Sequence, residues 1–252
     1  MSMKTNTLAG SCRAATLPHR RLMSSSLGPS DLNRHLSMLR LGSAALPIGA
    51  FAYSQGLETA IAQGKVRNVA ATVDWLKGLL EHSLLSSDVP LLARLHGAWT
   101  GLDVRQLNYW NHQWRAMRAT RELRDEDRQL GASLLRLLAR QGIEHADAQA
   151  ITGQPTLGLA MSLAAVTWGL DPQALGTTYC FAWAEAQVGA AVRLVPLGQT
   201  EAQTVISLLL PDIAAGLMGS LNLEDDQITS TVPGQTLCSA LHETLYTRLF
   251  RS

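Results

Sequence analysis

Apolar residues in this chain recur at intervals of three and four, the spacing that places side chains on one face of an α-helix. Leu32, Leu36 and Leu39 follow this pattern, and so does the longer stretch from 69 to 84. The alternation that predicts a β-strand is confined to residues 192–195, and Ala and Leu heavily outnumber the β-branched residues. The sequence therefore predicts an all-α protein, a compact bundle of about ten helices joined by short loops.

Capping residues predict where several of these helices begin. Asp31, Asn68 and Asp103 each precede an apolar helical pattern, where a short polar side chain can accept a hydrogen bond from an unpaired backbone N–H. Asp171 is followed by Pro172, which suits an N-cap residue followed by proline at the first helical position. We expect helices to start at all four positions.

Two prolines predict features of the helices that contain them. Pro90, close after Asp88, predicts that a helix opens there and runs through Trp99. Pro211 lies inside the helical pattern from 199 to 215 and predicts a kink or a break near its end, because proline has no N–H to donate.

One stretch is suited to the centre of the bundle. Residues 173–195 are almost uniformly apolar and small, which lets neighbouring helices approach closely. Trp110 and Trp114 are four residues apart, on one face of an earlier helix, and are expected to pack in the core.

The two ends differ from this central region, so we divide the chain into three parts. Residues 1–30 contain basic residues but no acids, and we expect a disordered leader, with Met23 as an alternative start. Residues 31–220 form the predicted helical domain. Residues 221–252 are expected to be a flexible tail, which would order when its apolar residues are buried on a partner.

The charge balance narrows the class of partner. The chain has 21 basic and 20 acidic residues, a formal net charge of +1, which is too even for a broad surface that binds nucleic acid or anionic lipid. A protein partner fits this composition better. The cysteines are three in number and form no CxxC motif, so neither a disulfide framework nor a cysteine zinc site is predicted.

Motifs for common catalytic sites are missing from the sequence. There is no phosphate-binding glycine loop and no nucleophile elbow, and the seven histidines lack the spacing of metal ligands. The acidic runs at 125–127 and 224–226 each place three consecutive acids on different sides of a helix, so we interpret both as solvated surface.

Two alternatives stay open at this point. One is a helical enzyme with an unrecognised site built from dispersed carboxylates and histidines. The other is a membrane-associated helical protein, suggested by the apolar segments 156–170 and 173–195. The first segment is shorter than the roughly 18–20 residues that cross a bilayer, and Glu185 makes insertion of the second costly.

A motif near the N-terminal end of the helical region points to a known family. Residues 46–58 read LPIGAFAYSQGLE, which resembles the UreF signature LPxG followed by two aromatics, S-x and GLE. Further similarities follow in the family's order at 88–91, 120–124, 192–199 and 242–252, so the resemblance extends from about residue 31 to residue 252.

This resemblance implies a function as well as a fold. Proteins of the UreF family are all-helical and typically homodimeric. They act as non-catalytic adaptors that bridge a UreD/UreH-type protein and the GTPase UreG on apo-urease, and possible control of GTP hydrolysis is part of this role. The partners handle nickel and GTP, so we expect no directly bound cofactor, a cytoplasmic location, and no nucleic-acid or membrane contact.

The resemblance and the residue types together give the candidate site residues. Pro47, Gly49, Ser54 and Gly56 are expected to form the turn and its helix packing. Partner contacts are expected from aromatic, acidic and basic residues near this turn, at the end of the central helix and in the tail. These residues are Phe51, Tyr53, Glu58, Arg193, His242, Tyr246, Arg248, Phe250 and Arg251. Arg193 stands where the family commonly has Lys, and either the helix dipole or a partner carboxylate explains a cation there.

Overall fold

The computed structural model describes residues 28–143, 151 and 153–252, so nearly all of the predicted leader lies outside the described residues. Over these ranges every regular element is helical and no strand occurs, which confirms the all-α prediction. Ten α-helices follow in order: α1 Pro29–Leu41, α2 Leu57–Ala62, α3 Val69–Leu79, α4 Val89–Thr100, α5 Val104–Ala116, α6 Arg121–Arg140, α7 Leu157–Thr167, α8 Pro172–Leu194, α9 Gln199–Leu221 and α10 Pro233–His242. The described residues also include the short 3-10 turns η1 Ala50–Ala52 and η4 Asp225–Gln227, and a π-helical segment, η2, at Leu80–Asp88.

Three of the predicted caps are confirmed. The side chains of Asn68, Asp103 and Asp171 accept hydrogen bonds from backbone N–H groups three residues later, at 3.0, 3.0 and 2.8 Å. The prediction for Asp31 was wrong, because α1 begins at Pro29 with Gly28 as its N-cap residue. Proline's fixed φ suits the first helical turn, so the helix starts earlier and Asp31 lies within that turn.

The two proline predictions have different outcomes. A helix opens where Pro90 predicted it, because α4 begins at Val89, has Pro90 in its first turn and runs past Trp99 to Thr100. The π-helical segment η2 leads directly into it, and Asp88 makes no side-chain cap. The break predicted at Pro211 was wrong, because α9 continues past this residue; Pro211 is exposed, so water can pair the carbonyl that lacks an N–H partner. A kink at Pro211 stays a prediction.

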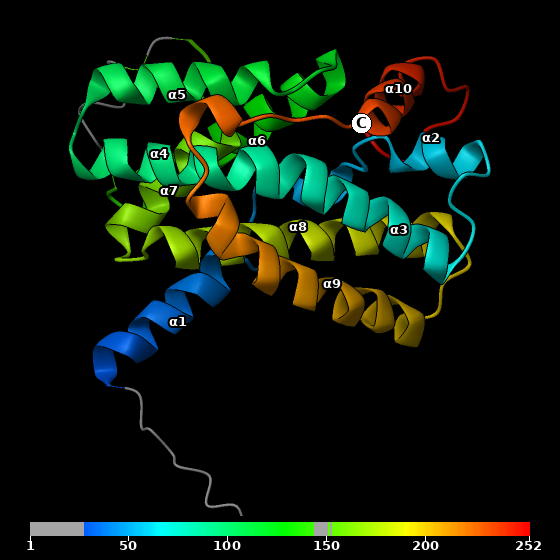
Figure 1. Ribbon diagram of the computed structural model, residues 1–252, viewed down its shortest axis with the longest axis horizontal. Coiled ribbons are helices and arrows are strands. Elements are labelled where there is room, and N and C mark those ends of the chain that lie inside the picture. The colour runs from blue at the N-terminus through cyan, green and yellow to red at the C-terminus, as the bar shows by residue number, and fades with distance from the viewer. Residues whose placement is uncertain (1–27, 144–150, 152) are drawn as a thin grey trace, which may run out of the picture.

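The main core surrounds α4 and α8, which run side by side through the middle of the molecule (Figure 1). Helix α4 packs against α5, α7, α8 and α9, and α8 also contacts α1 and α2. Trp114 and Leu175 are fully buried here, and Trp110 is 8% exposed, as expected for core residues. The prediction that 173–195 forms a central helix is confirmed.

A second, smaller core lies where α2, α10 and the last turns of α8 meet. It is formed by Leu57, Ala60, Val66, Ala190, Ala191, Val195, Leu197, Cys238 and Phe250. Phe250 comes from the region that was predicted to be a flexible tail. In the structure this region contains η4 and α10, and residues 243–252, here called the C-terminal segment, return to α2 (Figure 1). That the region orders on partner binding stays a prediction.

Helix α9 is the described helix whose length and composition would allow it to cross a membrane, and the core helices of soluble proteins pass the same test. It packs along α8 and α3. The segments 156–170 and 173–195, which had suggested a membrane, form α7 and α8 of the main core.

Candidate partner-binding surface

The turn between α1 and α2 brings the chain close to α10. Gly49 and Gly56 have φ values of +88° and +85°, a region that favours glycine. A Cβ atom on Gly56 would lie 3.0 Å from the backbone nitrogen of Ser239 and 3.2 Å from the carbonyl oxygen of Gln235. Glycine at this position therefore permits the close contact between the start of α2 and helix α10.

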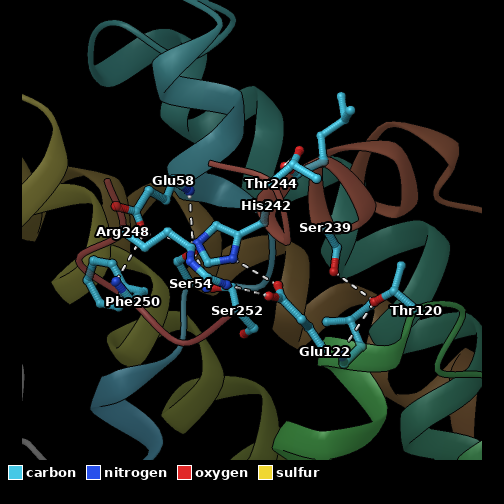
Figure 2. Close-up of polar contacts among 12 residues, drawn as sticks. Ser54, Glu58, Thr120, Glu122, Ser239, His242, Thr244, Arg248, Phe250 and Ser252 are labelled. Atoms are coloured by element: carbon cyan, nitrogen blue, oxygen red, sulfur yellow. Dashed lines mark hydrogen bonds and ion pairs between the residues drawn. The ribbon is translucent and has the colours of Figure 1, made fainter. Parts of the chain in front are cut away.

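Glu58, in the first turn of α2, anchors the C-terminal segment. One of its carboxylate oxygens accepts the N–H of Leu249 at 2.7 Å, and the other accepts the N–H of Phe250 at 3.0 Å. His242, at the end of α10, places Nε2 3.1 Å from the same carboxylate (Figure 2). Glu58 is buried, so a partner reaches it only if the C-terminal segment moves away.

His242 also contacts α6, and its side chain is fully buried. Its Nδ1 lies 2.8 Å from Glu122, and Arg248 donates to the other oxygen of Glu122 at 3.1 Å (Figure 2). We call Glu58, Glu122, His242 and Arg248 the clamp, because they join α2, α6, α10 and the C-terminal segment.

The end of the C-terminal segment pairs with the turn. The backbone N–H of Arg251 donates to the carbonyl of Ala52 at 2.9 Å, and the N–H of Ser54 donates to the carbonyl of Ser252 at 2.8 Å. Tyr53, also buried, donates its hydroxyl to Gln129 of α6 at 2.7 Å. Ser54 and Tyr53 therefore have partners within the chain when the C-terminal segment lies against the turn.

Other candidate residues face outward. Tyr246 is fully exposed, and Phe51 is 65% exposed. Leu249 is also exposed, as are Leu237 and Leu241, which lie four residues apart on α10. Arg248 and Arg251 are exposed at the edge of the clamp. Large exposed apolar side chains gathered on one segment are typical of a surface that binds a partner.

Arg193 links the turn to the C-terminal segment. Its guanidinium donates to the carbonyl of Phe51 at 3.2 Å and lies 5.9 Å from the centre of the Phe250 ring. Arg193 and Phe51 also line a pocket of about 250 Å³ between residues 41–53 and α8. The structure thus brings the candidate residues of the turn, the end of α8 and the C-terminal segment into one region.

Comparison with known proteins assigns the chain to a family. The family model UreF matches residues 66–210. A protein of Alkalilimnicola ehrlichii named urease accessory protein UreF is 42% identical over 233 residues, 91% of this chain and 100% of the relative. The chain belongs to the UreF family. Proteins of the same name from Chromohalobacter salexigens and Pseudomonas putida are each 41% identical, over 85% and 86% of this chain and 93% and 97% of their own lengths.

As a member of the UreF family, this chain is a urease accessory protein, and the resemblance inferred from its sequence is confirmed. The relatives are matched over nearly their whole length, so the similarity is not limited to one motif. In the described part of the chain, no three His, Cys, Asp or Glu side chains are grouped so that they could hold a metal ion.

The acidic run on α6 was misinterpreted as wholly solvated in the sequence. Glu126 and Asp127 are only 5% and 6% exposed. Glu126 accepts hydrogen bonds from the Gln55 amide and the Ser252 hydroxyl, both at 2.8 Å. Asp127 accepts from the indole N–H of Trp114 at 2.7 Å. Because each carboxylate meets donors from other elements, burial becomes tolerable.

Burial also changes how these two acids titrate. It raises the pKa of Glu126 from 4.5 to about 7, although the hydrogen bonds from Gln55 and Ser252 lower it. Burial likewise raises the pKa of Asp127 from 3.8 to about 6, against the lowering effect of the Arg118 guanidinium. Both side chains therefore change charge close to neutral pH.

Glu122 and Ser239 were also missed in the sequence. The side chain of Glu122 is 12% exposed and contacts both His242 and Arg248 of the clamp. The Ser239 hydroxyl lies 2.7 Å from that of Thr120, the N-cap residue of α6 (Figure 2). The signal for Thr120 was available, because Thr precedes an apolar helical pattern there, but its long-range partner has no local signature.

Proposed function

We propose that this accessory protein is a non-catalytic adaptor, which joins a UreD/UreH-type protein to the GTPase UreG while nickel is inserted into apo-urease. The family supplies the urease context. The observation that carries the proposal is the C-terminal segment, which a buried clamp holds against the body while Tyr246 and Leu249 face solvent.

The UreD/UreH-type partner is assigned to this exposed side of the C-terminal region. Tyr246 and Leu249 offer the aromatic and apolar area from which interface hot spots are built, and Leu241 extends this area onto α10. The clamp fixes the backbone beneath them, so less conformational entropy is lost when the partner binds. Phe250 and His242 support the surface from within.

UreG is assigned to the region around Arg193 and Phe51. Arg193 is exposed although it lies at the end of a largely buried helix, and Phe51 exposes most of its ring beside it. A cation next to an apolar ring suits a partner surface that carries a carboxylate among apolar groups. Contact at this region would position UreG on the adaptor and modulate GTP hydrolysis.

In this proposal the metal and the nucleotide stay with the partners, and the complex works in the cytoplasm. The adaptor raises the effective concentration of UreG beside apo-urease, which accelerates nickel transfer without any catalytic group of its own.

A homodimer is part of the same proposal, and α1 offers the contact. Helix α1 turns polar residues toward the body: Arg34 pairs with Asp171, and the Arg40 guanidinium lies 4.3 Å from the centre of the Trp168 ring. Its apolar residues Leu32, Leu36 and Leu39 are 52%, 55% and 70% exposed. This arrangement is the reverse of an ordinary surface helix, and a second copy of the chain would cover the leucines.

Light scattering of the purified chain tests the dimer. Leu36→Asp should give a monomer with unchanged helical content, because Leu36 faces away from the core. A dimer that survives this substitution contradicts the assignment to α1.

Co-purification tests the adaptor. The intact chain should capture the UreD/UreH-type protein and UreG together, whereas Tyr246→Ala should lose the former and Arg193→Ala the latter. Each variant is the control for the other, because each is expected to lose only one of the two partners. Capture of both partners by both variants would refute the assignments.

A further inference from the structure

The buried histidine of the clamp faces two acceptors. Nδ1 of His242 lies 2.8 Å from Glu122 and Nε2 lies 3.1 Å from Glu58, so each ring nitrogen points at a carboxylate oxygen (Figure 2). Neutral imidazole carries only one N–H, and its second nitrogen is an acceptor. Both contacts are therefore favourable only when the cluster holds one further proton, on the ring or on one of the two carboxyl groups.

The surrounding donors stabilise negative charge on both carboxylates. Glu58 accepts the N–H groups of Leu249 and Phe250, and Glu122 accepts the guanidinium of Arg248. Hydrogen bonds and a neighbouring cation both favour the charged form of a carboxyl group. Within the described residues, these two acids are the titratable groups in contact with the His242 ring, one from α2 and one from α6, and Arg248 approaches through Glu122. The proton required by this geometry consequently resides on His242.

We propose that docking of the C-terminal segment takes up a proton on His242, so that the segment is held in mildly acidic solution and released as the pH rises above neutrality. When the ring loses its proton, one nitrogen lone pair meets a carboxylate in a buried site, which opposes docking. Histidine is the side chain whose charge ordinarily changes between about pH 5 and 8. This inference rests on the proposed function for its consequence, namely that the partner surface at Tyr246 and Leu249 is presented only while the segment is docked.

Hydrogen exchange of the full chain, followed by mass spectrometry on peptides covering residues 243–252, measures docking directly. After correction for intrinsic exchange rates, protection should fall at least about tenfold between about pH 6 and pH 8, because one proton changes an equilibrium by up to tenfold per pH unit. Protection that is the same at both pH values overturns the proposal.

Glu122→Gln provides a sharper test than removal of the histidine. The amide oxygen of the new side chain would accept from Arg248 as the Glu122 carboxylate does, and its NH₂ group would donate to Nδ1 of a neutral His242. Docking should then persist at about pH 8, with less than about a threefold change across the range. If Glu122→Gln releases the segment at high pH as the wild type does, or loses docking at every pH, the proposal is wrong.

Two histidine variants complete the set. Glu126 also contacts the segment, at Ser252, and changes charge close to neutral pH, so His242→Gln is combined with Glu126→Gln. This double variant should give a protection profile that is flat with pH, because neither titrating group remains. His112→Gln is the matched control, since His112 is an exposed residue of α5 and its loss should leave the wild-type profile unchanged. A pH dependence that is as large in the double variant as in Glu126→Gln alone would overturn the proposal.

Capture of the UreD/UreH-type partner separates this inference from the proposed function. Between about pH 6.5 and pH 8, capture by the wild type should weaken more than capture by Glu122→Gln. Titration of the partner affects both proteins equally, so the comparison of the two corrects for it. If protection falls with pH but the two capture profiles agree, the assignment of the partner surface fails and the proton-linked docking stands. If capture depends on Tyr246 but protection is independent of pH, the proton-linked docking fails alone.

Discussion

The buried carboxyl group of Glu126 predicts a specific dependence of stability on pH. In the folded chain its pKa is about 7, against 4.5 for the free side chain, because burial penalises the charged form. The difference corresponds to roughly 3 kcal/mol, at about 1.4 kcal/mol for each pH unit. A carboxyl group with a raised pKa stabilises the fold below the unfolded value, and this contribution is lost as the pH rises through the folded value. The free energy of unfolding should therefore fall between about pH 4.5 and 7.

Glu126→Gln should remove this contribution. The Gln amide oxygen can accept from Gln55 and its NH₂ group can donate to the Ser252 hydroxyl, so both native contacts have an equivalent. Urea unfolding followed by circular dichroism at several pH values gives the difference between variant and wild type. That difference should change by roughly 3 kcal/mol in favour of the variant between about pH 4.5 and 8. Asp125→Asn, on the exposed side of the same helix, is the control and should change little. If the free energy of unfolding changes with pH equally in Glu126→Gln and in the wild type, the reasoning is refuted. Asp127 does not obscure this result, because it is present in both proteins and its effect cancels in their difference.

Three further substitutions test contacts within the fold, including the 2.9 Å ion pair between Arg118 and the buried Asp88 carboxylate. Gly56→Ala should destabilise the fold by about 2 kcal/mol or more in urea unfolding, because its φ is positive and the new Cβ meets α10; Gly189→Ala, with open space around it, should not. Arg118→Met should cost about 3–5 kcal/mol by the same measurement, because it leaves the buried Asp88 carboxylate unpaired, and adding Asp88→Asn should restore part of the loss. Phe250→Ala should lower hydrogen-exchange protection of residues 243–252 at least about tenfold while α8 keeps its protection, since Phe250 packs in the second core. The Gly56 contact is contradicted if the two glycine variants are equally stable. The Arg118 contact is contradicted if the double variant recovers no stability, and the Phe250 contact if protection is unchanged in Phe250→Ala.

Local patterns were sufficient for much of the fold. Asn68, Asp103 and Asp171 cap helices because a cap depends on residues within one turn, which the sequence displays directly. The small apolar residues of α8 likewise predicted its central place, because only such a helix can be surrounded on most sides.

Long-range contacts decided the features that were missed. Glu126 and Asp127 look like a solvated acidic run, and only donors brought from Gln55, Ser252 and Trp114 make their burial possible. Pro211 carries an ordinary interruption signal, yet α9 continues past it, because this residue lies on the exposed face of the helix.

The candidate site was also predicted only in part, from its local sequence signals. The signature around Gly56 and Glu58 marked the right region, because glycine and acid at a turn are visible in sequence. Its arrangement was not predictable, since Glu58 is separated by more than 180 residues from the partners that it holds. Helix α10 was also missed, although Pro233 at its start and the spacing of Leu237 and Leu241 are local signals for it.

The affinity of the chain for a UreD/UreH-type partner tests the central claim most directly. Isothermal titration calorimetry should compare the wild type with the double variant Tyr246→Ala and Leu249→Ala, and with Leu208→Ala, an exposed leucine of α9, as the control. Loss of two hot-spot side chains should weaken binding by about 100-fold, because each contributes roughly 1.4 kcal/mol or more, and the control should bind as the wild type does. A double variant that binds within about twofold of the wild type would contradict the claim that this segment presents the partner surface.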